Sequence, residues 1–158
     1  MKDASYSNNM KEIYHLGYAI MLRDANRDIE ATTLLKEYGN DAPSSILNIR
    51  LQIAVPKMDF EEMKEVFKYA SDSQCPIPDH LLNLFFAVTR ILYEQMDNYP
   101  DNLNIENLQT KRAFTEYLKY LRKQEVDIDW LSSVEEHLTP IFLPFLACIY
   151  KDKISLKK

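Results

Sequence analysis

Apolar residues recur at helical spacing in eight separate segments of this chain, and that pattern limits what it can fold into. In residues 9–25, four apolar side chains fall on one stripe of a helix. They are Ile13, Leu16, Ile20 and Met21. Glycine occurs only twice in 158 residues. Long runs of helical period with so little glycine predict an all-α fold, and they argue against the glycine-rich turns of phosphate-binding and dinucleotide-binding folds.

Caps and helix-breaking residues separate the eight predicted helices. Gly39 ends the second helix, and Asp59 with Glu62 three residues later forms an N-terminal capping signal for the fourth. Pro144 is expected to kink or split the last helix. The predicted helices are residues 9–25, residues 27–38, one from Ser44 or Ser45 to before Pro56, one after Asp59, one after Asp79, residues 105–123, and two that begin near Asp129 and near Thr139.

Residues 28–38 and 59–69 echo one another, with Asp, Glu and Tyr in matching places. Cap positions in the first three helix pairs also begin about 35 residues apart, the period of helical-hairpin repeats. We therefore predict helices stacked as antiparallel hairpins, an α-solenoid-like arrangement. The alternative is a compact helical bundle in which the fifth helix contacts nearly every other helix. Either way the chain is expected to be a single domain, 1–158, with a polar N-terminal tail 1–8 and a basic C-terminal tail 151–158.

The net charge and the cysteine content limit the classes of partner and the cellular compartments that fit this chain. The formal net charge is -5, so nucleic acid is not the default partner. The two cysteines, Cys75 and Cys148, lie far apart, and no Asn-x-Ser/Thr glycosylation site occurs. The polar N-terminus does not resemble a secretory signal, and the apolar run 138–150 is shorter than a membrane span. We expect an intracellular, cytoplasmic protein without a transmembrane segment.

Catalytic patterns are missing from the sequence. The three histidines are scattered, with no spacing typical of a zinc site. Glu61, Glu62 and Glu65 lie within one helical turn, and we interpret them as a solvated first turn that complements the helix dipole. We therefore expect no enzyme activity, no cofactor and no metal.

One segment resembles a known repeat family. Residues 77–86 carry Pro78, Asp79 and Asn83, similar to the opening of a pentatricopeptide repeat, and Asn48 holds a comparable place one repeat earlier. Residues 117–127 look like the closing helix and turn of such a repeat. The chain thus resembles the tetratricopeptide and pentatricopeptide repeat families over about two thirds of its length, without the tetratricopeptide Trp, Gly and Pro signature.

These features predict a protein–protein interaction or adaptor module. It would bind a helix or an extended peptide of another protein in a groove between helices, anchored by Tyr14, Tyr18 and Tyr117, because tyrosine is enriched at interfaces. The pentatricopeptide resemblance implies an alternative, single-stranded RNA in the same groove. In this alternative, the RNA would be contacted by four polar residues, Asn48, Asn83, Lys119 and Lys123. A third alternative is a bundle like the viral apoptosis inhibitors, whose Asn-Trp-Gly-Arg run is absent here. The oligomeric state stays open.

Overall fold

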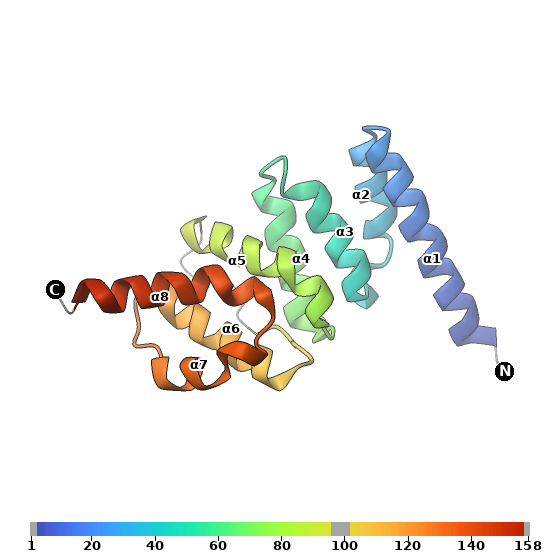
Figure 1. The fold of residues 1–158 in the computed structure, drawn as a ribbon. Helices are drawn as coiled ribbons and strands as arrows, with labels where there is room; N and C mark the ends of the chain where they lie inside the picture. The colour runs from blue at the N-terminus through green and yellow to red at the C-terminus, as the bar shows by residue number, and fades with distance from the viewer. Residues whose placement is uncertain (1–2, 96–101, 157–158) are drawn as a thin grey trace.

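The computed structural model describes residues 3–95 and 102–156, and within these ranges the secondary structure is helical apart from one isolated β-bridge (Figure 1). The all-α prediction is confirmed. The α-helices are α1 (Asp3–Asp24), α2 (Asp28–Lys36), α3 (Ser44–Ala54), α4 (Phe60–Ser73), α5 (Leu82–Gln95), α6 (Leu108–Leu121), α7 (Ile128–Val134) and α8 (Leu143–Leu156). The 3-10 helices are η1 (Gly39–Asp41), η2 (Asp79–Leu81), η3 (Glu135–His137) and η4 (Pro140–Phe142).

The helices are arranged in chain order along the molecule. α1 packs against α2, α3 packs against α4, and α3 also contacts α1 and α2. The main contacts of α5 are with α3 and α4 on one side and with α6 on the other. Phe86 of α5 also meets Phe142 of η4 edge to face, with their ring centroids 5.3 Å apart. α1 forms one end of the molecule, and α6, α7 and α8 form the other (Figure 1).

The predicted start of α4 is confirmed. The Asp59 carboxylate accepts a hydrogen bond from the backbone N–H of Glu62 at 3.2 Å, which satisfies one of the free amides at the helix start. The Glu62 side chain does not complete the capping box, because it pairs with Arg50 of α3 instead. The helix ends at Gln74, which takes a left-handed conformation with φ of 50°.

Both predicted tails are partly helical. α1 begins at Asp3, so residues 3–8 continue the helix, and α8 extends to Leu156 through most of the basic segment. Neither stretch contains glycine or proline, and nothing in it ends a helix. Residues 1–2 and 157–158 lie outside the described residues. The helix predicted to begin near Thr139 is divided into η4 and α8 just before Pro144, which is the second residue of α8, where a missing N–H costs no hydrogen bond.

Two other predicted caps have different roles. Asp79 opens η2, and its Oδ2 accepts hydrogen bonds from the hydroxyls of Thr110 and Thr139, at 3.3 Å each. It therefore joins three segments of the chain instead of capping α5. α3 follows Pro43 and has no side-chain cap, and the Ser45 hydroxyl donates to Glu12 of α1 at 2.6 Å.

The isolated bridge joins the segments that lead into α5 and α6. The N–H of Ile77 donates to the carbonyl of Asn104 at 2.8 Å, and the N–H of Glu106 donates to the carbonyl of Ile77 at 3.1 Å. The Asn104 side chain adds a bond to the carbonyl of Gln74 at 2.8 Å. Because these hydrogen bonds join the two segments, they hold the start of α5 close to the start of α6.

Candidate functional site

The outer face of α1 carries a row of large apolar side chains that no other element of the described residues covers. Five of them are between 42% and 69% exposed. They are Met10, Ile13, Tyr14, Tyr18 and Met21, which we call the α1 stripe. Gly17 lies in their midst, and a Cβ added to it would meet no atom within 4 Å. The spacing of three and four residues places all of them on one side of the helix.

The opposite face of α1 accounts for why the stripe is left outside. Ala19 and Leu22 are buried against the rest of the molecule, with Leu16 and Ile20 partly buried beside them. α1 therefore has apolar residues on two faces, and the core covers one. The sequence pattern grouped Ile13 and Met21 with the core-facing residues Leu16 and Ile20, and the structure corrects that grouping.

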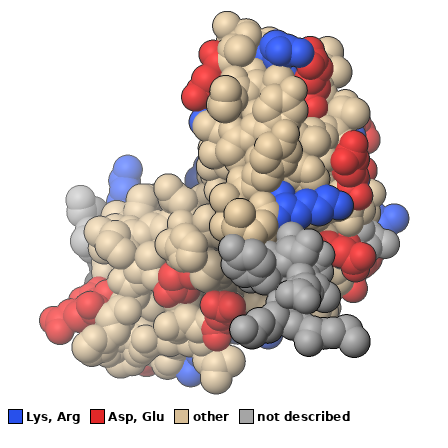
Figure 2. All heavy atoms as spheres, turned by 90° about the vertical axis from the view of Figure 1, so that its right-hand side faces the viewer, with Lys and Arg blue, Asp and Glu red and all other residues tan. Residues whose placement is uncertain are grey.

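Charge is absent from the stripe. Figure 2, which views the molecule from the α1 side, shows a column of uncharged surface, bordered by a basic side chain just above the grey residues and by charged side chains at the top. Charged residues just beyond the stripe pair with each other: Arg23 lies 3.3 Å from Asp24, and the Arg27 guanidinium donates to Glu30 at 2.9 Å. The face is therefore suited to apolar contact rather than to binding an ion.

A series of rings leads from the stripe to a polar hollow. Tyr18 and Tyr14 stack with their centroids 6.2 Å apart, and Tyr14 lies 5.8 Å from the ring of His15. His15 in turn meets Tyr38 edge to face at 5.4 Å, and its Nδ1 is 2.9 Å from the Tyr38 hydroxyl. The ring contacts connect the exposed Tyr14 to His15, and His15 alone packs against Tyr38 beyond the end of α2.

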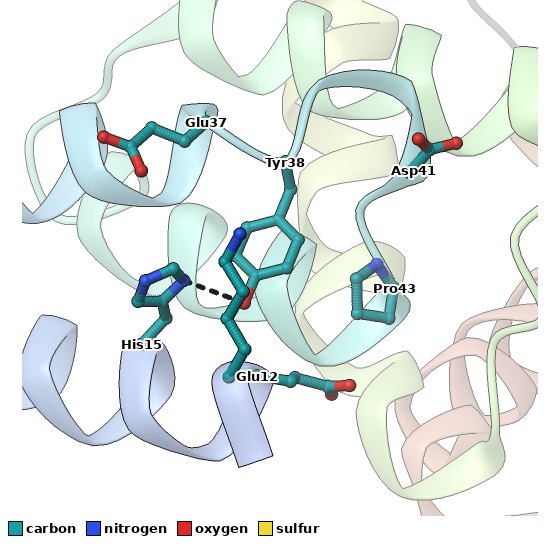
Figure 3. A pocket seen from close by; sticks show the side chains of 7 residues that line it. Glu12, His15, Glu37, Tyr38, Asp41 and Pro43 are labelled. Atoms are coloured by element: carbon teal, nitrogen blue, oxygen red, sulfur yellow. Dashed lines mark hydrogen bonds between the residues drawn. The ribbon is translucent and has the colours of Figure 1, made fainter. Parts of the chain in front are cut away.

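The polar hollow has a volume of about 430 Å³ (Figure 3). Its carboxylates lie apart, with Glu37 and Asp41 on different sides of the central His15–Tyr38 contact. The pKa of Tyr38 is raised, first by burial and then by the charges of Glu12 and Glu37, so its hydroxyl stays protonated at neutral pH. Among the described residues, no group of three or more His, Cys, Asp and Glu side chains is placed to hold a metal ion.

A buried ion pair lies between α3 and α4, and the sequence did not predict it. Arg50 is 1% exposed and pairs with Glu62, which is 6% exposed. Glu65 lies 3.6 Å from the same guanidinium and 3.3 Å from Lys36. Burial alone raises the pKa of Glu65, but the hydrogen bond from Tyr69 and the charges of Lys36 and Arg50 outweigh it and lower the pKa. Glu62 is thus a core residue, contrary to the solvated first turn expected for it.

Tyr117 was predicted to line a binding groove, and in the structure it borders a hollow between α5, α6 and α8 as a largely buried residue. It is 4% exposed, with its ring stacked on Phe86 at 4.1 Å and meeting Phe145 at 5.2 Å. α8 packs against the side of α6 that carries Tyr117. The apolar pattern of α6 alone does not predict that another helix buries this side. Burial raises the pKa of Tyr117 to about 12.

The remaining predicted binding residues do not gather in one place. Asn48 is half-buried on α3, and Asn83 is exposed near the start of α5. Lys119 pairs with Glu116 at 3.0 Å and borders a hollow formed by residues 125–129. Lys123, which follows α6, borders a different hollow.

The seven predicted residues are therefore spread along the molecule, with Asn48 on α3 and Asn83 on α5 between its two ends. Tyr14 and Tyr18 lie on α1 at one end, whereas Tyr117 and Lys119 lie on α6 at the other (Figure 1). Only the first two belong to the exposed α1 stripe. Met10, Ile13 and Met21 were missed as binding residues, although the number of apolar positions in the first predicted helix exceeds what one face can bury.

No described helix combines the length and the apolar character that crossing a membrane requires. Comparison with protein-family models, with curated proteins and with solved structures found no match for this chain. The resemblance to helical-hairpin repeat families therefore stays a prediction.

Proposed function

We propose that this protein is an interaction module that binds a helix of a partner protein along the α1 stripe. The observation that carries the proposal is the row of five large, exposed apolar side chains on one face of one helix. Exposed apolar patches of this kind mark binding surfaces in soluble proteins. Two of the five are tyrosines, whose rigid amphipathic rings are common in the centre of interfaces.

The shape of the stripe favours a helical partner over an extended peptide. An extended peptide gains most of its affinity from backbone hydrogen bonds to a free sheet edge, and α1 already uses its backbone groups within the helix. A second helix can place its side-chain ridges between the side chains of the stripe, at an axis distance of roughly 8–10 Å. Gly17 leaves a gap in the row into which a large side chain of the partner fits.

The test compares partner capture by the wild-type chain with capture by a variant carrying Ile13→Glu and Met21→Glu. Both residues face away from the core, so the variant is expected to fold with an unchanged circular dichroism spectrum. We expect it to lose every partner that uses the stripe, including further copies of the chain itself.

Leu108→Glu is the matched control, because Leu108 is a large apolar residue that is 81% exposed at the start of α6, outside the stripe. It should retain the partners of the wild-type chain. Identical partner sets for all three proteins, and identical self-association, would show that the stripe is not a binding surface.

A further inference from the structure

The α1 stripe is arranged so that it can pair with itself. Its members and Gly17 occupy positions that are symmetric about the midpoint between His15 and Leu16. If two copies of α1 pack antiparallel about a two-fold axis through that midpoint, each stripe residue faces either another stripe residue or Gly17. The opposed pairs are Met10 with Met21, Ile13 with Tyr18, and Tyr14 with Gly17. We propose that the helix bound by this stripe is α1 of a second copy of the chain.

The sizes of the side chains favour the antiparallel orientation. It places the ring of Tyr14 over Gly17 of the second copy, where there is open space for it. A parallel pair in register would set Tyr14 against Tyr14 and Gly17 against Gly17, with crowding at one level and a gap at the next. Two-fold pairing is also the commonest symmetry of homo-oligomers, and it buries the same patch on both copies.

The area of the stripe is enough for such a dimer. From their exposed fractions and ordinary side-chain areas, the five residues leave roughly 600 Å² of surface per copy, so complete cover of both stripes buries about 1,200 Å², the lower end of a specific interface. The described part of the chain also leaves the approach open, because α1 forms the end face of the molecule (Figures 1 and 2). An interface of this size without charged pairs is expected to be a concentration-dependent dimer rather than a permanent one.

The first experiment measures mass by sedimentation as a function of protein concentration. We expect the wild-type chain to approach twice the mass of one chain, as does Leu108→Glu, and Met21→Glu to remain monomeric. Gly17→Gln should also remain monomeric, because its side chain fills the space that Tyr14 of the second copy needs. Since glutamine is a better helix former than glycine, this variant loses association without losing stability as a monomer.

Cross-linking then tests the orientation, in a Cys148→Ser background that removes the exposed cysteine. A mixture of Met10→Cys chains and Met21→Cys chains, treated with a short bis-maleimide, should give a covalent dimer. Either variant alone should give little, since identical positions lie far apart in an antiparallel pair. Strong cross-linking of Met10→Cys alone, or a dimer that survives both Met21→Glu and Gly17→Gln, would overturn this arrangement.

This inference rests on the proposed function, but the two can fail separately. A wild-type chain that stays monomeric at every concentration, while the Ile13→Glu and Met21→Glu variant loses another protein that the wild type captures, would refute the self-pairing and leave the interaction surface in place. A chain that stays monomeric and shows no stripe-dependent partner would refute both.

Discussion

The two glycines of the chain, Gly17 and Gly39, have different backbone conformations. Gly17 lies inside α1 with open space around its Cα, whereas Gly39 has a φ of +55° between α2 and α3. Glycine inside a helix is unfavourable relative to alanine, because more backbone freedom is lost on folding. In the left-handed region the preference is reversed.

We therefore expect Gly17→Ala to raise the free energy of unfolding by about 1 kcal/mol, and Gly39→Ala to lower it by about 1 kcal/mol. Urea unfolding followed by circular dichroism, at protein concentrations low enough for monomers, measures both. Gly39→Ala serves as the control, since it makes the same chemical change in the other environment. Equal effects from the two variants would contradict the helical placement of Gly17.

The Arg50–Glu62 pair provides a second prediction for single residues. Removing one member of a buried ion pair leaves the other charge without a counterion in the core, so Arg50→Met alone should destabilise the protein by about 3–5 kcal/mol. Arg50→Met combined with Glu62→Leu should recover much of that loss, because apolar residues of similar volume replace both charges. A double-mutant cycle in urea measures the coupling.

The exposed pair Arg27–Glu30 is the control for this cycle. Both of its side chains are more than half exposed, so solvent screens the pair and Arg27→Ala should leave the stability nearly unchanged. A double variant at Arg50 and Glu62 that is as unstable as the sum of its single changes would show that the two residues do not act as a pair.

Among the elements, α4 has the best-defined start. The Asp59 carboxylate caps the helix, so Asp59→Ala should lower the free energy of unfolding by about 1 kcal/mol. Asp59→Asn keeps an oxygen acceptor in the same place and should cost much less. Thermal unfolding of the three proteins under one buffer condition measures the difference, and equal losses from alanine and asparagine would argue against capping as the cause.

Helices could be predicted from the sequence more completely than their surroundings. The start of α4 depends on residues only three positions apart, Asp59 and Glu62, so the local sequence is enough to predict it. By contrast, which apolar face of α1 is buried depends on where α2 and α3 lie. Tyr117 is buried by Phe86 and Phe145, which are about 30 residues away on either side. The pairing of Arg50 with Glu62 likewise forms only when α3 and α4 meet. These long-range arrangements are the ones that local patterns miss.

For the molecule as a whole, Tyr117 predicts how stability depends on alkaline pH. Its pKa is about 12 in the folded chain, against an ordinary value of 10.0 that applies when the chain is unfolded. Between these values the unfolded chain has lost the proton and the folded chain still holds it, so stability is full below about pH 10 and falls as pH rises toward 12. The loss attributable to this residue is on the order of 2 kcal/mol.

Tyr117→Phe removes the ionisable hydroxyl and keeps the ring. We expect its stability to fall less steeply than that of the wild-type chain between about pH 10 and pH 12, with the difference measured by urea unfolding at each pH. Tyr14→Phe makes the same chemical change at an exposed tyrosine and is the matched control. Parallel pH profiles for the wild type and Tyr117→Phe would contradict the burial of the hydroxyl.

Trp130 is the single tryptophan of the chain, and it lies in α7, at the end of the molecule opposite α1 (Figure 1). The guanidinium of Arg112 lies 4.1 Å from the centre of the Trp130 ring and also pairs with Asp127. Its fluorescence therefore reports the environment of that end alone, while the circular dichroism signal sums over all helices. If the two signals change together during unfolding, the row of helices unfolds as one cooperative unit. If they separate, the two ends have different stabilities, and the end that carries the α1 stripe can open while the end around Trp130 stays folded.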